Sequence, residues 1–253
     1  MSNSVERALR ILVELAEGPT TISELGRRLD VHRTTSLRLL RTLEEERFVR
    51  RADDGSYQLG PRLAALAAAA LDGLDIRDSA ARHLAALSDT CGQTVHLGAL
   101  EGRQVMYLDK VESRQAVRMY SHIGALAPLH ATGIGKVILA YLSAGERDEL
   151  LGESPYPRYT ANTLTDRDAL DEVLDRTARQ GWTLDDFEHE EFIHCVAAPV
   201  FDAAGRVAAA VSVSAPSMVL DRPGLLAFTD DLTATAHAIS EELGWSRRGP
   251  LRD

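Results

Sequence analysis

The adjacent residues His194 and Cys195 could in principle form a base and a nucleophile. They open a β-prone run, however, and neighbouring residues of a strand point to opposite faces, so they cannot readily share a proton. His189 and His194 lack the Cys or His cluster that a zinc site needs. We therefore predict no catalytic residue, no metal, no cofactor and no enzymatic activity.

A second candidate site is the segment from His130 to Lys136, in which Gly133 and Gly135 flank Ile134. It is no nucleotide-binding P-loop, because the earlier glycine is missing and Val137 replaces the Ser or Thr that would bind magnesium. Two interpretations stay open. The segment is a tight turn with Lys136 in solvent, or its backbone N–H groups bind a carboxylate at a helix start.

Two serines, Ser212 and Ser214, lie at the period of a strand, so both hydroxyls face one side while Val211 and Val213 face the other. If the serines face water, they need no explanation. If they face a cavity, they are polar anchors in an apolar pocket.

Cationic residues gather nearer the amino terminus, in two predicted short helices, 21–29 and 32–45, that are joined by a tight turn. The second helix buries its leucines, and its other side carries Arg and Thr, which suit phosphates and base edges in a major groove. An ordinary solvated face is the alternative. The predicted DNA-contacting residues of this helix are Arg33, Thr34, Thr35, Arg38, Arg41 and Thr42.

The next residues predict a β-hairpin around Asp54-Gly55, so that the whole unit is a winged helix-turn-helix. Its Arg50 and Arg51 would meet the DNA backbone. The formal charge of −10 does not contradict this, because residues 1–60 hold as many Arg as acidic residues and the rest of the chain carries the excess. Local cationic surface governs contact with phosphates.

Length and composition limit the number of domains and the cellular compartment that we expect. A chain of 253 residues with 45% hydrophobic content can form two domains. Two cysteines suit a reducing compartment, and neither a signal peptide nor an apolar run of membrane-spanning length is evident. We expect a cytoplasmic protein without a membrane partner.

Two helices should frame the winged helix. The first, ending at Gly18-Pro19, would bury the stripe Val5, Ala8, Leu9, Leu12, Val13 and Ala16. A linker helix, 61–78, carries the stripe Leu63, Leu66, Ala67, Ala70, Leu71 and Leu74, and its other faces are alanine-rich. Such a helix favours packing against a second copy of the chain, and packing on its own second domain is the alternative.

The remaining residues predict a mixed second domain. Helices are expected at 76–90, 134–142, 143–151, 166–180 and 223–243, and strands at 94–100, 104–111, 116–121, 196–201 and 207–214. Strands interrupted by helices predict an α+β class with a largely antiparallel sheet.

Ordered motifs along nearly the whole chain resemble the IclR family of transcriptional regulators. They include ISELGRRLDVHRTTSLRLLRTLEEERFVRR (22–51), PLHATGIGKVILAYL (128–142) and EFIHCVAAPVFDAAGRVAAAVSVSAPS (191–217). The resemblance implies a winged helix-turn-helix over 1–60, the linker at 61–78 and a GAF-like effector-binding domain over 79–247. It also implies operator DNA as a partner, a small-molecule effector and assembly as a homodimer or homotetramer.

The resemblance assigns the effector site to the backbone of Gly133 and Ile134 and to the side chains of Asp185, Cys195, Ser212 and Ser214. The helix-start geometry favours an organic acid, and we expect a repressor. The rival class is an enzyme or sensor whose winged helix binds protein. Phe192 stands where the family commonly has Gly, so its ring is expected to narrow or reshape the pocket.

Overall fold

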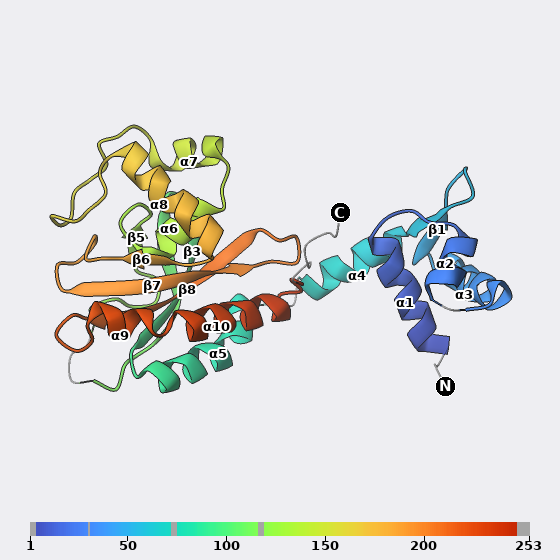
Figure 1. Cartoon of the computed structure of the whole chain (residues 1–253), viewed down its shortest axis with the longest axis horizontal. Helices are drawn as coiled ribbons and strands as arrows, with labels where there is room; N and C mark the ends of the chain where they lie inside the picture. Colours follow the sequence, from blue (N-terminus) through green and yellow to red (C-terminus); the bar gives the residue numbers. More distant parts are fainter. Residues whose placement is uncertain (1–3, 30, 72–74, 116–118, 247–253) are drawn as a thin grey trace. The chain divides into compact units, whose positions relative to one another are not determined.

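The computed structural model describes residues 4–29, 31–71, 75–115 and 119–246, and of residues 67–71 it describes only the backbone. The chain divides into two compact units, Met1–Leu74 and Asp75–Asp253 (Figure 1). No helix of the described part is long and apolar enough to cross a membrane.

The first unit is a winged helix. Its core joins residues from three helices and both wing strands, and Ile11, Leu15, Leu25, Leu40 and Val49 are buried in it. The wing strands pair antiparallel, with Arg50 opposite Gln58. The elements are α1 (Ser4–Ala16), α2 (Ile22–Arg28), α3 (Arg33–Glu45), β1 (Val49–Arg51), β2 (Tyr57–Leu59) and α4 (Pro61–Leu71).

The predicted buried stripe of α1 is wrong for most of its residues, although Leu12 packs against the core. Ile11 and Leu15 are buried, whereas Val5, Leu9 and Val13 are 63%, 59% and 66% exposed. Apolar residues occupy most directions around this helix, so helical spacing alone cannot decide which side is buried. The contacts that α1 makes with α3 and β2 decide it.

The predicted linker helix can be compared with the structure only in part. Helix α4 ends at Leu71, and Leu66 is exposed on it. The side chains of Ala67, Ala70 and Leu71, and all of Leu74, lie outside the described residues.

The second unit is a six-stranded antiparallel sheet between two layers of helices, which confirms the predicted α+β class (Figure 1). The strand order is β5-β4-β3-β8-β7-β6. The strands are β3 (Thr94–Glu101), β4 (Gln104–Val111), β5 (Leu126–Pro128), β6 (Thr183–Asp185), β7 (Ile193–Phe201) and β8 (Val207–Pro216). The helices are α5 (Ile76–Cys91), α6 (Gly133–Ala140), α7 (Ala144–Leu151), α8 (Arg167–Gln180), α9 (Arg222–Leu226) and α10 (Thr229–Glu242).

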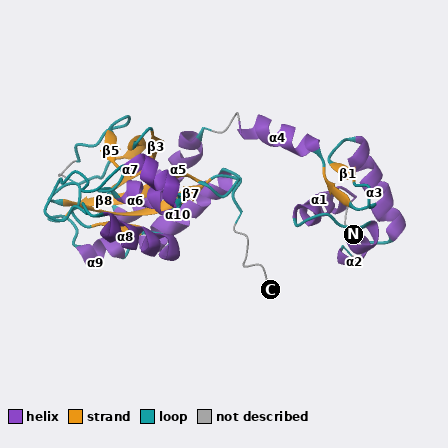
Figure 2. Ribbon diagram, turned by 90° about the horizontal axis from the view of Figure 1, so that it is seen from above, coloured by secondary structure: helices purple, strands orange, loops and turns teal. Residues whose placement is uncertain are grey.

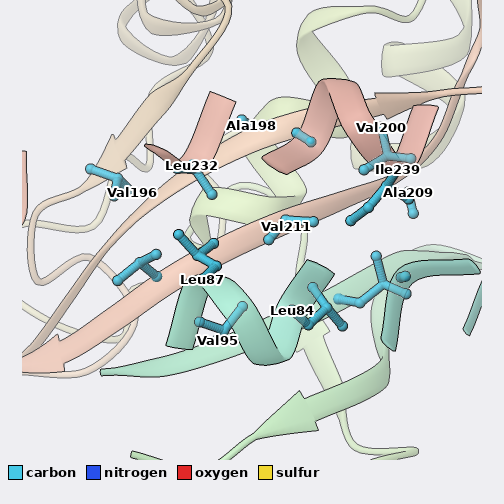
Figure 3. Close-up of a cluster of buried hydrophobic side chains, with 14 of the residues drawn as sticks. Leu84, Leu87, Val95, Val196, Ala198, Val200, Ala209, Val211, Leu232 and Ile239 are labelled. Atoms are coloured by element: carbon cyan, nitrogen blue, oxygen red, sulfur yellow. The ribbon is translucent and has the colours of Figure 1, made fainter. Parts of the chain in front are cut away.

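Alternation along β7 separates the two cores of this unit. Val196 and Ala198 pack with α5 and α10, and the intervening Ala197 packs with α6 and α8. Figure 3 shows the first core, in which Leu84 and Leu232 lie against the sheet. Figure 2 colours the same elements by type. The site described below lies where α6 begins against the sheet.

Three expectations for this unit need correction. The expected strand 116–121 is not formed at residues 119–121, and residues 116–118 lie outside the described part. The sheet instead gains β5 and β6, edge strands of three residues that are too short to show a period. The expected helix 223–243 is two helices, α9 and α10, because the chain turns at Ala227 and Phe228.

Candidate functional site

The recognition helix α3 is fixed by its buried side and presents a cationic one. Leu40 packs against Leu25 of α2 in the core. Of the six predicted DNA-contacting residues on α3, only Thr35 is half-buried, and the exposed ones are Arg33, Thr34, Arg38, Arg41 and Thr42.

The arginines of this face are free to meet a partner. Arg33, Arg38 and Arg41 form no ion pair within the described residues, whereas the hydroxyls of the two exposed threonines, Thr34 and Thr42, have local contacts. Thr34 Oγ1 lies 2.9 Å from His32 Nδ1, and Thr42 Oγ1 donates to the Arg38 carbonyl at 3.3 Å. The unpaired guanidinium groups are therefore the stronger candidates for base or phosphate contacts.

The wing holds its two arginines in different ways. Arg50 donates to Gln58 Oε1 at 2.9 Å, and the Arg51 guanidinium carbon lies 5.9 Å from the centre of the Tyr57 ring. The Asp54 carboxylate accepts from the Ser56 N–H at 2.9 Å, which fixes the turn between the strands. Both arginines are exposed on the wing.

In the second unit, one cavity brings together all six predicted effector residues. The space in it that a water-sized sphere can reach is ≈ 30 Å³, so the cavity is narrow. The six are Gly133, Ile134, Asp185, Cys195, Ser212 and Ser214. The lining also includes six residues that no sequence pattern assigned to the site: Tyr107, Met119, Thr132, His189, Glu190 and Ile193.

Strand register explains the convergence. Asp185 of β6 lies opposite Cys195 of β7, which in turn lies opposite Ser214 of β8. The next inward position on β8 is Ser212, while Val211 and Val213 point into the other core. Of the two interpretations of these serines, the structure therefore supports the cavity.

The start of α6 closes one side of the cavity. Thr132 caps the helix, with its hydroxyl accepting from the Gly135 N–H at 3.2 Å. The Gly133 N–H is hydrogen-bonded to the Cys195 sulfur, and a Cβ at Gly133 would lie 2.8 Å from that sulfur. The Ile134 N–H has no acceptor within the described residues, so this donor is open to a ligand.

Burial dominates the titration of the polar groups. It is the largest cause of a pKa of about 7 for Asp185, with the attraction of Lys136 acting against it and the charges of Glu188 and Glu190 acting in the same direction as burial. Burial and Asp185 also raise the pKa of the Cys195 thiol, whose sulfur lies 4.0 Å from Asp185 Oδ2. A thiol kept neutral in this way is a poor nucleophile.

Lys136 is buried, which overturns the interpretation that placed it in solvent. Its ammonium group donates to the Leu184 carbonyl at 2.7 Å and to the Glu188 carboxylate. Glu188 comes from a loop far along the chain, so no local pattern around Lys136 could reveal the pair.

His96 extends the polar network behind Ser214. Its Nδ1 lies 3.5 Å from Ser214 Oγ and its Nε2 lies 2.8 Å from Ser121 Oγ. Burial, and next the charge of Lys110, lower the pKa of His96 to about 3, so the ring is neutral. No local pattern around His96 indicates this role, beyond the presence of a histidine in a strand.

Of the two histidines considered as metal ligands, His189 lines the cavity and His194 lies outside it. His194 points away from Cys195 and contacts the Leu220 carbonyl through Nε2 at 2.9 Å. No group of three His, Cys, Asp or Glu side chains in the described part could hold a metal. Phe192 is 62% exposed and does not line the cavity, so the expected narrowing by its ring is not seen.

Known proteins match nearly the whole chain. The family model described as "Bacterial transcriptional regulator IclR C-terminal" matches residues 68–241, and the model "HVO_A0261 N-terminal domain" matches residues 1–82. The HTH-type transcriptional regulator XynR of Escherichia coli (strain K12) is 38% identical, over 96% of this chain and 97% of that protein.

Two further relatives carry repressor names. The HTH-type transcriptional repressor AllR of Escherichia coli (strain K12) is 29% identical over 96% of this chain and 91% of its own. The crystal structure of the Agobacterium tumefaciens repressor BlcR has a TM-score of 0.78 and is 30% identical. That match covers 96% of this chain and 98% of that one.

Proposed function

The chain belongs to the IclR family of bacterial transcriptional regulators, and from that premise we propose that it is a repressor controlled by a small organic acid. The acid would bind in the cavity of the second unit and change the affinity of the first unit for operator DNA. Such a protein acts in the cytoplasm, where its operator lies.

The DNA half of the proposal rests on the unpaired arginines of α3. Arg38 lies mid-helix on the exposed side, where a guanidinium can donate two hydrogen bonds to guanine. Arg33, Thr34, Thr35, Arg41 and Thr42 would surround it, and Arg50 and Arg51 of the wing would contact phosphates.

The effector half rests on the cavity at the start of α6. The Ile134 N–H is an open donor at a helix end that favours negative charge, and the Ser212 hydroxyl, 2% exposed by residue, has no hydrogen-bond partner within the described residues. Ser214 and Cys195 add polar contacts, and the Tyr107 ring and the Met119 side chain complete a site suited to a small acid.

Repression and assembly are supported by relatives and by the linker. AllR and BlcR are described as repressors. A winged helix that reads two half-sites needs a second copy, and α4, on which Ala64, Ala65 and Leu66 are exposed, offers an apolar surface for a homodimer or homotetramer. Coupling requires that the effector bind the DNA-bound and DNA-free arrangements with different affinity.

Fluorescence anisotropy on duplex DNA from upstream of the protein's own gene tests the proposal. We expect this DNA to bind at least about a thousandfold more tightly than random duplex, with strong salt dependence. A binding acid should change operator affinity by about 5- to 150-fold. Equal affinity for both duplexes would contradict an operator-specific regulator.

A double variant, Ser212→Ala with Ser214→Ala, separates the two halves. It should keep effector-free operator affinity and lose the response to the acid, because both hydroxyls line the cavity. Ser217→Ala, at an exposed position after the same strand, is the matched control and should respond as the wild type does. A full response in the double variant would place the effector elsewhere.

A further inference from the structure

The cavity has an unusual charge content for a site that binds an acid. Its lining includes two carboxylates, Asp185 and Glu190, and among the described residues it includes no Lys or Arg. An anion entering this cavity meets like charge in a partly desolvated setting, which is costly unless one of the carboxylates becomes neutral.

The nearest buried cation cannot compensate the anion. Lys136 is fully buried behind the lining, and its ammonium is occupied by the Leu184 carbonyl and the Glu188 carboxylate. Asp185, Glu188 and Glu190 therefore outnumber Lys136 around the site before any effector arrives.

From this arrangement we infer that an acidic effector binds as a carboxylate together with one proton from solvent, and that Asp185 holds this proton. The inference rests on the proposed function, in that it requires an acid in this cavity. The reaction balances in charge: an aspartate, a hydrogen ion and an effector carboxylate give an aspartic acid that donates to the bound carboxylate.

The hydrogen bonds of Asp185 decide which oxygen carries the proton. Oδ1 accepts from the Glu188 N–H at 2.8 Å, so it acts as an acceptor. Oδ2 faces the Cys195 thiol at 4.0 Å, beside the other cavity groups. Protonated Oδ2 becomes a donor next to the hydroxyls of Ser212 and Ser214, so the cavity offers the effector donors in place of a negative charge.

The direction of the pH dependence follows from the protonation state of Asp185 in the effector-free protein. Asp185 has a pKa of about 7, so below that pH it is already neutral and the acid binds without proton uptake. Above it the proton must be taken up on binding, so affinity falls as pH rises. Between about pH 5.5 and about pH 8.5 we expect the dissociation constant to rise about thirtyfold.

Other titratable groups near Asp185 must be distinguished from it as the acceptor of the proton. Burial lowers the pKa of His189, and an anion could draw a proton onto that ring instead. Burial raises the pKa of Cys195 and of Tyr107, which keeps both neutral across this range. Burial also raises the pKa of Glu188, against the attraction of Lys136.

The test is isothermal titration calorimetry of the full chain with acetate, lactate, gluconate and benzoate as probes. Buffers of different ionisation enthalpy give the number of protons taken up. We expect close to one proton per bound acid at about pH 8.5 and close to none at about pH 5.5.

Asp185→Asn is the decisive variant, because its amide keeps an acceptor for the Glu188 N–H and supplies a permanent donor at the other position. It should abolish proton uptake and bind the acid more tightly than wild type at about pH 8.5, with less than about a twofold change in affinity between the two pH values. Asp186→Asn, one residue along and paired with Arg222 at 3.1 Å, is the matched control and should keep the uptake.

The outcomes separate the two proposals. Binding of an acid without proton uptake would overturn the proton-coupled mechanism and leave the acidic effector standing. Uptake that survives Asp185→Asn and disappears in His189→Gln would assign the proton to the histidine and overturn the role of Asp185. Failure of all four acids to bind at either pH would overturn the acidic effector itself.

Discussion

The helices α3 and α6 meet their proposed partners in opposite ways. The outward side chains of α3 project into water, and its arginines form no ion pair in the described part of the chain. All eight residues of α6 are buried, and its one charge, Lys136, is neutralised by Glu188. A change on the exposed face of α3 should therefore alter binding, whereas a change on α6 should first alter folding.

The largest effect should come from Lys136→Met, which keeps much of the side-chain volume and leaves the Glu188 carboxylate buried without its cation. We expect a loss of about 3–5 kcal/mol in the free energy of unfolding of the second unit. Urea denaturation followed by tryptophan fluorescence measures it, because Trp182 and Trp245, the two tryptophans, both belong to this unit.

Two variants control for this result. Adding Glu188→Gln to Lys136→Met removes the unpaired charge and should recover part of the lost stability. Arg206→Ala removes a surface ion pair with Asp202, in which the Arg206 side chain is 81% exposed, and should cost about 0–1 kcal/mol. If Lys136→Met cost no more than Arg206→Ala, the contrast between the two helices would fail.

Arg38→Ala sharpens the other side of the contrast. Because Arg38 is exposed and makes no ion pair within the described residues, its loss should leave the free energy of unfolding within about 0.5 kcal/mol. Operator affinity, measured by anisotropy, should fall by about 1–3 kcal/mol if the guanidinium reads a guanine edge.

Random DNA of the same length and the variant Arg206→Ala complete that experiment. A loss equal on operator and random duplex would make Arg38 a phosphate contact. No loss of affinity on either duplex would contradict the placement of α3 in the major groove. Arg206→Ala removes the same charge from the other compact unit and should leave operator affinity unchanged.

The same contrast explains what the sequence could reveal. On α3 the signal is local, because the buried Leu40, the half-buried Leu39 and Leu43 and the exposed arginines lie within one helix. Ser212 and Ser214 were also predictable, since the period of a strand assigns them to one face. Edge strands β5 and β6 have three residues each, too few to establish a period.

What could not be predicted depends on contacts between distant segments. Lys136 and Glu188 are 52 residues apart, and His96 and Ser214 are 118 apart. The residues next to each member of these pairs in the sequence do not indicate its partner. The prediction of the buried side of α1 failed for a related reason. Several apolar stripes were possible on this helix, and packing against α3 and β2 determines that Ile11 and Leu15 are buried.

The smallest expected effect tests whether the wing behaves like α3. Arg51 is exposed on β1, with its guanidinium over the Tyr57 ring, and it has no base edge assigned to it. As a phosphate contact, it should contribute about 1 kcal/mol at physiological salt, the same on operator and random DNA. Arg51→Ala should also lower the slope of log affinity against log salt by about 0.9, because one fewer counterion is released. Anisotropy titrations at four salt concentrations measure both quantities, with Arg206→Ala as the charge-matched control.

A loss confined to the operator would show that Arg51 reads sequence, and an unchanged slope would show that the wing does not touch the DNA backbone through this residue.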